Sequence, residues 1–306
     1  MHYYHYRSAG LTISSQLALP EFGAVQHPTS HPDVLIQEGK VSCAGTEPAP
    51  PGTYSWRSAS DQFLFEVAEV ARFQVKGGSQ IIFERLSTDD VLLKLYLLGS
   101  VIGALWHQRG RLPLHAGGVV IDNLAWAFVG NSGAGKSSLV AALSEVAGAG
   151  YLSDDVCIID VPNNRSPVAW PGLARLRASP ELCAALRLED PLFVGAQDPF
   201  GKHAMMAPWE QPLSAIPLAG VIVLEATATP ATPAMEQLTA AASLSAILEH
   251  TYRPEYLATE GQELHFQQCA ALTRQIRVYR LRRSWDLSRL PTEAIDIAHL
   301  LRVRAT

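Results

Sequence analysis

The stretch Leu124-Ala-Trp-Ala-Phe-Val-Gly-Asn-Ser-Gly-Ala-Gly-Lys-Ser-Ser138 decides the fold of this chain. Its first six residues are mostly apolar and predict a buried strand, and residues 130–137 match the pattern G-x-x-x-x-G-K-S. The apolar run 139–143 predicts that a helix follows. A strand, a glycine loop and a helix in this order make the short motif specific. An ordinary glycine turn is the alternative, and it does not account for all four fixed positions.

The residue types in this loop suit phosphate binding. Glycine has no side chain and adopts backbone angles closed to other residues, so the loop N–H groups can turn toward a phosphate. The positive end of the following helix points to the same place. Lys136, expected at an exposed loop end, adds a cation for the outer phosphates, and the Ser137 hydroxyl can ligate Mg²⁺.

Two adjacent aspartates follow, between apolar runs within residues 151–160. Burying Asp154 and Asp155 without partners would be costly. A strand–helix–strand unit places the end of its second strand beside the end of its first, so we expect the pair near Lys136 and Ser137. One carboxylate can then hold magnesium while the other accepts a proton from an attacking hydroxyl. A surface Asp-Asp turn is the alternative.

His115 precedes a predicted hairpin. Residues 119–121, the turn 122–123 and the strand 124–129 predict two antiparallel strands, the second of which leads into the glycine loop. We therefore expect His115 near the phosphates. The alternative is a histidine satisfied at a strand end, and position alone favours neither.

Composition narrows the class of protein. The chain is 48% hydrophobic and 17% charged, which is typical of a domain with a core, and its net charge of −5 without a dense Lys/Arg block argues against nucleic acid as a partner. The four widely spaced cysteines predict free thiols in a reducing compartment. The N-terminus does not resemble a secretory signal, and the apolar run 95–106 is too short to span a bilayer. We expect a cytoplasmic protein without a membrane partner; a homo-oligomer remains open.

The expected organisation is α/β, with two domains. Residues 1–87 alternate short strands, among them 63–67, 71–75 and 81–84, with turns and predict a smaller, β-rich N-terminal domain. Residues 88–306 are expected to form the P-loop domain, entered through a connecting helix at 88–108 that is apolar nearly all round. Further elements are expected in the rest of the chain: helices at 180–188, 244–252, 263–275 and 291–304, and strands at 218–225 and 276–281.

The stretch from residue 115 to residue 160 resembles the HPr kinase/phosphorylase family. Members carry a histidine-led hairpin, a glycine loop and an Asp-Asp pair at the end of the next strand. The matching segments here are Leu114-His115-Ala116, Gly130-Asn131-Ser132-Gly133-Ala134-Gly135-Lys136-Ser137 and Leu152-Ser153-Asp154-Asp155. The match is close over these residues and loose over the following hundred or so. The resemblance implies an HPr-kinase-like P-loop domain.

The resemblance also implies roles for single residues. Asp154 would be the base toward a substrate serine, Asp155 and Ser137 would serve Mg²⁺, and His115 would be the active-site histidine beside Lys136. The phosphates of ATP, or of another nucleoside triphosphate, would be held by the loop residues Gly130, Asn131, Ser132, Gly133, Ala134, Gly135, Lys136, Ser137 and Ser138.

Two departures from the family's sequence pattern argue against HPr as the substrate. Ser138 stands where the bacterial regulators have an acidic residue, and their C-terminal segment that engages HPr has no counterpart here. The segment 6–13, Tyr-Arg-Ser-Ala-Gly-Leu-Thr-Ile, is similar to HPr-kinase-like proteins of peptide biosynthesis, including lasso-peptide tailoring kinases. Segments 63–67 and 112–116 fit that branch too.

Three functions follow as hypotheses. The first is an ATP- and Mg²⁺-dependent kinase that phosphorylates a serine, expected to be C-terminal, of a ribosomally made precursor peptide such as a lasso-peptide precursor. The second keeps HPr or another protein as the acceptor, with or without a reverse phosphorylase reaction. The third is a nucleotide-binding regulatory protein without transfer activity, for which the Asp pair would have no use.

Overall fold

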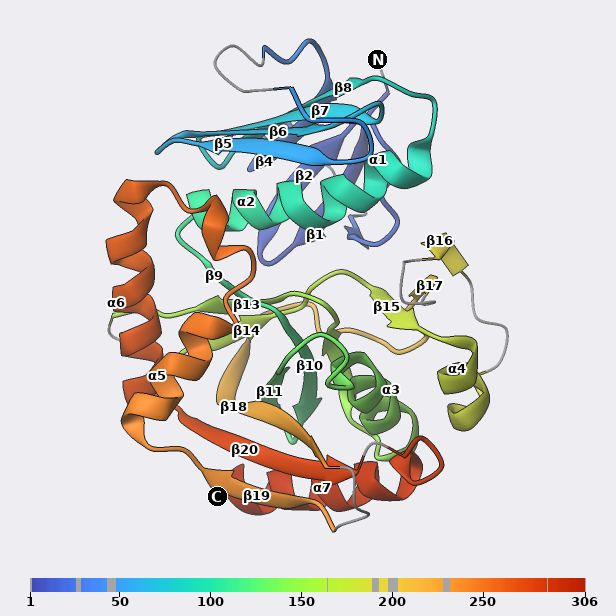
Figure 1. The fold of residues 1–306 in the computed structure, drawn as a ribbon, viewed down its shortest axis with the longest axis vertical. Coiled ribbons are helices and arrows are strands. Elements are labelled where there is room, and N and C mark those ends of the chain that lie inside the picture. Colours follow the sequence, from blue (N-terminus) through green and yellow to red (C-terminus); the bar gives the residue numbers. More distant parts are fainter. Residues whose placement is uncertain are drawn as a thin grey trace. The chain divides into compact units, whose positions relative to one another are not determined.

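A computed structural model describes residues 2–25, 29–42, 48–163, 165–188, 193–197, 203–227, 232–284 and 286–305, with 193–197 as backbone alone. The chain divides into two compact units. The first comprises Met1–Pro113 and Tyr252–Gln267, and the second comprises Leu114–Thr251 and Gln268–Thr306. Both contain helices and sheets, so the α/β prediction is confirmed (Figure 1).

The first unit is built on one mixed sheet. Its strands are β1 (Tyr4–Ser8), β2 (Leu11–Ser15), β3 (Gly23–Ala24), β4 (Val34–Glu38), β5 (Tyr54–Ser58), β6 (Gln62–Val67), β7 (Ala71–Lys76) and β8 (Gln80–Arg85). Their order is β3-β1-β2-β4-β8-β7-β6-β5. Strand β7 shows why these residues form a sheet: Ala71, Phe73 and Val75 alternate with polar residues and are buried. The predicted strands at 63–67, 71–75 and 81–84 lie within β6, β7 and β8.

One long helical segment covers this sheet. It consists of α1 (Asp90–Tyr96), a π-helical stretch at Leu97–Val101 and α2 (Ile102–Gln108). Asp89 caps its start, because its carboxylate accepts hydrogen bonds from the N–H groups of Val91 and Leu92. Among the described residues it is long and apolar enough to cross a membrane, yet 56% of its most apolar window is buried inside the protein. That burial is typical of a core helix.

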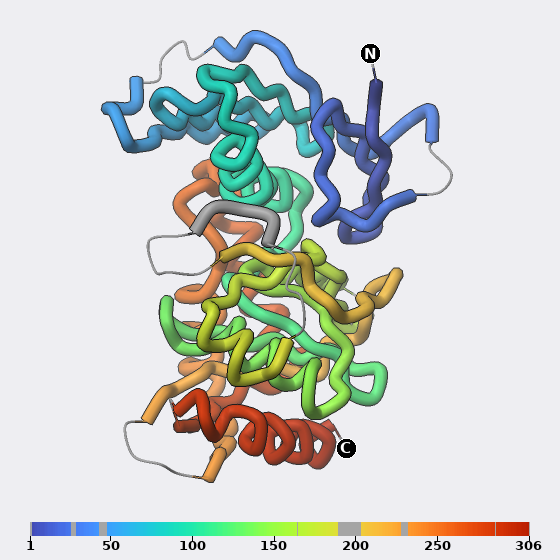
Figure 2. The backbone as a smooth tube through the Cα atoms, turned by 90° about the vertical axis from the view of Figure 1, so that its right-hand side faces the viewer, coloured from blue at the N-terminus to red at the C-terminus, as the bar shows by residue number. Residues whose placement is uncertain are grey.

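The helical segment belongs to the first unit. The rings of Phe65 and Tyr96 lie 6.0 Å apart, and His107 Nε2 lies 2.8 Å from the Tyr252 carbonyl oxygen. Tyr252 opens a returning segment with η2 (Pro254–Tyr256) and the start of α6 (Thr259–Gln275), drawn in orange beside teal α2 in Figures 1 and 2. The compact units therefore differ from the sequence division at residue 87, since 88–113 and 252–267 pack with the β-rich part.

The second unit contains the larger α/β core. Its main sheet is formed by β10 (Ala116–Ile121), β11 (Leu124–Val129), β12 (Gly150–Ser153), β13 (Cys157–Asp160), β14 (Val168–Trp170), β18 (Ile216–Thr227), β19 (Ala234–Gln237) and β20 (Arg277–Ser284). They run in the order β12-β10-β11-β18-β14-β13, with β20 beside β18 and β19 beside β20. The boundary between the two units falls within strand β9 (Leu112–Leu114). The hairpin β10–β11 is confirmed, and both turn residues, Asp122 and Asn123, have positive φ.

Helices bury the central strands of the second unit. Strand β11 runs parallel to β18 and is apolar along its length, as expected for a strand covered on both faces. Its Trp126 and Phe128 share one core with residues of α3 (Lys136–Val146) and α7 (Leu290–Ala305). The remaining helices are α4 (Pro180–Leu186) and α5 (Ala240–Glu249). A small sheet, β15-β17-β16, adds β15 (Arg175–Ala178), β16 (Phe193–Gln197) and β17 (His203–Met206).

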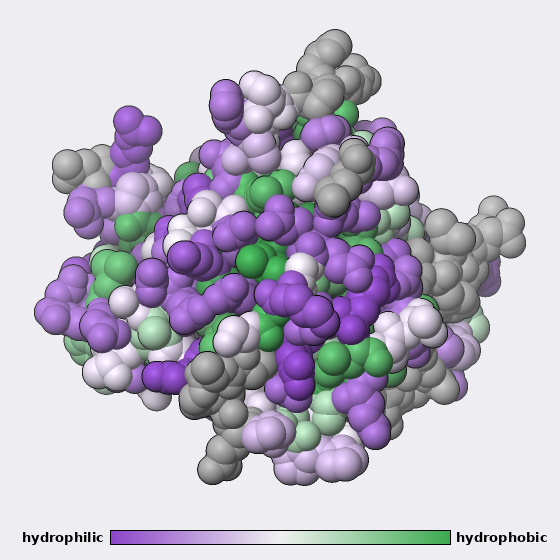
Figure 3. Space-filling model, turned by 90° about the horizontal axis from the view of Figure 1, so that it is seen from above, coloured by the Kyte–Doolittle hydropathy of each residue, from purple (hydrophilic) through white to green (hydrophobic). Residues whose placement is uncertain are grey.

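The described cysteines fit the free-thiol prediction. Cys157, Cys183 and Cys269 are buried and unbridged, whereas Cys43 lies outside the described residues. On the face shown in Figure 3, the coloured residues are mostly hydrophilic, and the hydrophobic ones form small separate groups.

His107 makes the first unit sensitive to pH. Burial lowers the pKa of His107 to about 4, which the Tyr252 carbonyl only partly offsets and His265 lowers further. Below its ordinary pKa of 6.5, the unfolded chain binds a proton that the folded unit resists. His107 alone should therefore contribute a fall in stability of about 2 kcal/mol from pH 7 to pH 5. Urea unfolding at both pH values measures this fall.

The variant His107→Gln keeps an N–H donor for Tyr252 and does not titrate, so it should lose about 2 kcal/mol less than the wild type on acidification. His31→Gln, which alters an exposed histidine of the same unit, is the matched control. Equal acid sensitivity of His107→Gln and the wild type would contradict the assignment.

Candidate functional site

A glycine loop joins β11 to α3 at the centre of the site. Gly130 follows the buried strand with φ 149°, and Gly135 precedes the helix with φ 81°. A Cβ at Gly130 would lie 3.2 Å from the Leu224 carbonyl oxygen. The backbone angles at positions 130 and 135 of the motif thus favour glycine. The predicted order of strand, loop and helix is present.

The Lys136 side chain folds back over this loop. Its Nζ donates to the carbonyl oxygens of Gly130, at 2.6 Å, and of Asn131, at 3.2 Å. Only 7% of the residue is exposed, so the expectation of an exposed loop end is wrong. The helix begins at Lys136 itself, and its first turn draws the aliphatic stem inward.

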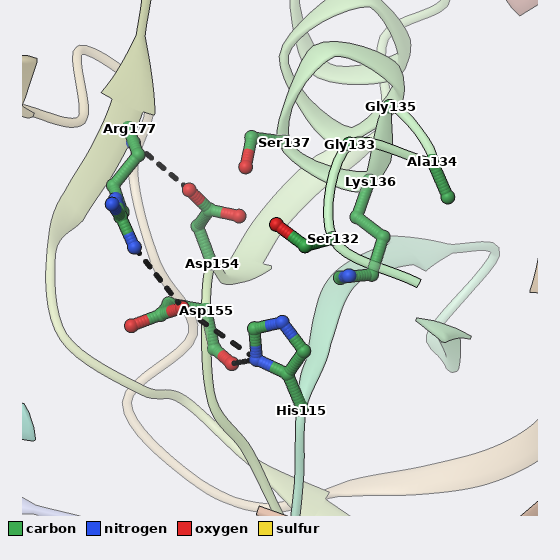
Figure 4. Close-up of a pocket in the computed structure, with 10 residues that line it drawn as sticks. All are labelled: His115, Ser132, Gly133, Ala134, Gly135, Lys136, Ser137, Asp154, Asp155 and Arg177. Carbon is green, nitrogen blue, oxygen red and sulfur yellow. Dashed lines mark hydrogen bonds and ion pairs between the residues drawn. The ribbon is translucent and has the colours of Figure 1, made fainter. Parts of the chain in front are cut away.

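A cavity of about 400 Å³ brings most of the predicted site residues together (Figure 4). It is lined by His115, Ser132, Gly133, Ala134, Gly135, Lys136, Ser137, Asp154, Asp155 and Arg177. Gly130 and Asn131 line a neighbouring cavity of about 290 Å³ beside His250. Ser138, the last predicted loop residue, lines neither.

Asp154 is buried at the floor of the main cavity. It is 4% exposed, and its Oδ2 accepts a hydrogen bond of 2.9 Å from the Arg177 backbone N–H. Its Oδ1 is buried and points toward the Ser137 hydroxyl in Figure 4. Burial raises the pKa of Asp154, Asp155 raises it further, and the Arg177 N–H and Ser137 oppose the rise. The result is a carboxylate with increased affinity for protons.

Asp155 lies among cations instead. Its Oδ1 is 3.6 Å from His115 Nδ1 and 3.7 Å from Arg177 Nη1, and its Oδ2 is 3.9 Å from Arg175 Nη2. Its backbone adopts the left-handed region, with φ 72°, which turns its side chain away from that of Asp154. The two neighbouring carboxylates therefore have different electrostatic surroundings.

His115 supports this turn. Its Nδ1 lies 3.1 Å from the Asp155 carbonyl oxygen, which can only accept, so Nδ1 carries the proton. Burial and, secondarily, Lys136 lower the pKa of His115, and Asp155 partly opposes them. These effects favour a neutral imidazole at pH 7.

Arg175 and Arg177 are site residues that the sequence reasoning did not identify. They lie two apart on β15 and so point to the same side of the strand, toward Asp155. Arg175 is buried, and its Nε has no hydrogen-bond partner among the described residues. The Arg-x-Arg spacing between apolar residues was the available signal, but nothing local predicted a strand there or linked it to the aspartates.

Gly117 allows helix α3 to approach the site. A Cβ at Gly117 would lie 2.7 Å from Val140 Cγ2 on α3 and 3.7 Å from Asp154 Oδ1. Val140 is buried and stiff at χ1, so it cannot move aside easily. Gly117→Ala should destabilise the protein by about 1–3 kcal/mol in urea unfolding, the usual cost of overpacking.

Gly150→Ala is the matched control, because a Cβ there would meet Val120 Cβ at an ordinary 3.4 Å. Loss of less than about 0.5 kcal/mol in Gly117→Ala would show that the helix does not pack against this strand as closely as described.

Comparisons with known proteins add little to this geometry. No protein-family model matches the chain, and no curated protein matches it. Among 80 matching chains of solved structures is the Hpr(Ser) kinase/phosphatase from Coxiella burnetii. It is 14% identical, the match covers 62% of this chain and 97% of that one, and the TM-score is 0.32. A likeness this distant does not transfer an activity, so function must be argued from the site.

Proposed function

We propose that this protein is an ATP- and Mg²⁺-dependent serine kinase. The observation that carries the proposal is the single cavity shared by the glycine loop, Lys136 and the two aspartates. Phosphoryl transfer needs a phosphate cradle, a cation on the moving group and a carboxylate near the acceptor hydroxyl. Each requirement has a residue in this cavity.

The loop would hold the nucleotide phosphates. Its N–H groups lie at the positive end of α3, where an anion is stabilised. Lys136 Nζ binds two loop carbonyl oxygens in the structure and would donate to the outer phosphates when they are present. These loop carbonyls thus keep the ammonium satisfied until the nucleotide arrives.

The residues also fit a magnesium ion bound together with phosphate. Mg²⁺ usually takes one or two carboxylates plus phosphate oxygens and water. Among the described residues, no group of three or more His, Cys, Asp or Glu side chains is arranged to hold a metal ion without phosphate. In the proposal Ser137 and Asp155 would hold the metal, which would supply positive charge at the outer phosphates.

Asp154 is proposed as the base. It accepts the proton of the serine hydroxyl while the serine Oγ–phosphorus bond forms and the bond from that phosphorus to the leaving ADP oxygen breaks. Burial supports this role because it raises the pKa of the carboxylate, and Oδ1 is the carboxylate oxygen that the Arg177 N–H does not bind. His115 is proposed to hold the strained Asp155 backbone through its Nδ1–H.

One observation favours the opposite order of the two aspartates. Ser137, the proposed metal ligand, lies beside Asp154 and not beside Asp155 (Figure 4). A metal at Ser137 could therefore be held by Asp154, leaving Asp155 near the acceptor. If Asp154 holds the metal, Asp154→Asn should change the Mg²⁺ dependence of ATP binding. If Asp155 holds it, Asp155→Asn should.

The acceptor we propose is a serine of a ribosomally made precursor peptide. Support comes from the resemblance of segments 6–13, 63–67 and 112–116 to kinases of peptide biosynthesis. We assign acceptor recognition to the β-rich first unit, because every proposed phosphate-handling residue belongs to the second. HPr remains the alternative acceptor, and the alternative without transfer is a nucleotide-binding regulator.

The experiment offers two acceptors to the full chain. The protein is incubated with ATP and Mg²⁺, together with the precursor peptide encoded beside its gene or with HPr, and both acceptors are examined by mass spectrometry. We expect one added phosphate on a serine of the peptide. Phosphate on HPr alone would replace the acceptor, and ATP binding without transfer to either would favour the regulator.

A further inference from the structure

We propose that Arg177 binds the terminal phosphate of the nucleotide and makes the site prefer a nucleoside triphosphate over a diphosphate. This inference rests on the proposed function, because it assumes that the cavity holds a nucleotide. It adds a specificity-determining residue to the site, from a strand outside the glycine loop.

The position of Arg177 carries the proposal. Its side chain lines the main cavity and is 34% exposed, on the opposite wall from Ser132 and Lys136 (Figure 4). Its backbone N–H binds Asp154 Oδ2 at 2.9 Å, which fixes this part of β15 against the aspartate pair. A phosphate beyond the loop, between Lys136 and the aspartates, would therefore meet the guanidinium.

The charges in the cavity support a second cation at that place. A terminal phosphate carries close to two negative charges, and Lys136 is the cationic side chain that the glycine loop supplies to it. Arginine presents a planar fork of donors that suits two phosphate oxygens at once. The guanidinium of Arg177 supplies such a fork at the cavity wall.

The ion pair between Arg177 and Asp155 is loose. The 3.7 Å separation between Nη1 and Oδ1 is longer than a good hydrogen bond. Arg175, which is buried, and His115 stay beside Asp155 when Arg177 turns to a phosphate. Arg175 is not among the cavity-lining residues, so the two arginines have separate roles: Arg175 stays on the carboxylate and Arg177 reaches the ligand.

The test compares ATP with ADP. Affinities of the full chain for each nucleotide, with Mg²⁺, are measured by titration calorimetry for the wild type, Arg177→Gln and Arg177→Lys. Loss of a charge-assisted contact to the terminal phosphate should weaken ATP binding by about 10- to 100-fold in Arg177→Gln. The affinity for ADP, a nucleotide that lacks the terminal phosphate, should change by less than about threefold. Arg177→Lys should recover part of the ATP affinity, because it keeps the charge but not the fork.

Arg187→Gln is the matched control, since Arg187 is an exposed arginine at the end of α4 and does not line the cavity. Equal weakening of ATP and ADP in both Arg177 variants would overturn the proposal and indicate a structural role for this residue. Unchanged ATP affinity in Arg177→Gln would overturn it as well, while leaving the kinase proposal intact. A wild-type protein that binds neither nucleotide would overturn both.

Discussion

Lys136→Met should lower the rate of phosphoryl transfer by about 10²–10³-fold, the usual effect of removing one preorganised donor from a developing charge. The ammonium lies at the mouth of the glycine loop, where it binds Gly130 and Asn131 and faces the cavity. Methionine keeps most of the buried stem, so the effect should come from the lost charge. Steady-state peptide phosphorylation measures the rate, and thermal unfolding checks the fold.

Lys76→Met, at the exposed end of β7, is the control for a lost lysine and should leave the rate unchanged. Wild-type turnover by Lys136→Met would show that the glycine loop does not handle the transferred phosphate. A loss of rate matched by a loss of folded protein would instead show that the two loop hydrogen bonds of Lys136 hold the fold.

Asp154→Asn should lower transfer by about 10²–10⁴-fold while Mg²⁺-dependent ATP binding persists, if Asp154 is the base. Asn has nearly the same shape but accepts no proton. Asp155→Asn should instead weaken the dependence of ATP binding on Mg²⁺, and added metal should restore part of the rate. ATP affinity at several Mg²⁺ concentrations, measured beside peptide phosphorylation, separates these effects.

The reverse pattern has a structural reason, because Ser137 lies beside Asp154. A metal defect in Asp154→Asn, with a pure rate defect in Asp155→Asn, would exchange the two roles. Wild-type transfer by both variants would contradict the kinase proposal for this pair.

The sequence predicted the strand, the glycine loop and the helix start well, because chemistry and local order coincide there. Residues 124–138 combine a buried strand, obligatory glycines and a helix start, and each of these depends on near neighbours in the chain. The aspartate pair lies near the loop as expected, although β10 separates β12 from β11 in the sheet. The β10–β11 hairpin followed from the Asp122-Asn123 turn.

Long-range packing limited the rest. The apolar pattern of 88–108 predicted a connecting helix. It did not predict that this helix packs with the β-rich unit, because that packing depends on Tyr252 returning more than a hundred residues later. The helix expected at 244–252 spans Ala240–Glu249. It begins earlier because the Thr239 side chain caps it by accepting a hydrogen bond from the Ala242 N–H. Arg177 meets Asp155 only through the fold of β15.

The burial of Lys136 was missed for a related reason. A lysine at the end of a glycine loop is usually expected in solvent, since its charge is costly to bury. Here two carbonyl oxygens of the loop itself satisfy the ammonium. Such a local bond between a side chain and the backbone leaves no trace in the hydrophobic pattern.

The most direct test is a crystal structure of the full chain with Mg²⁺ and a non-hydrolysable ATP analogue. The phosphates should lie along residues 130–137, with the terminal phosphate within hydrogen-bond distance of Lys136 Nζ and next to Asp154 and Asp155. An analogue bound outside this cavity, or with its terminal phosphate pointing away from the aspartates, would contradict the assignment of this cavity as a phosphoryl-transfer site.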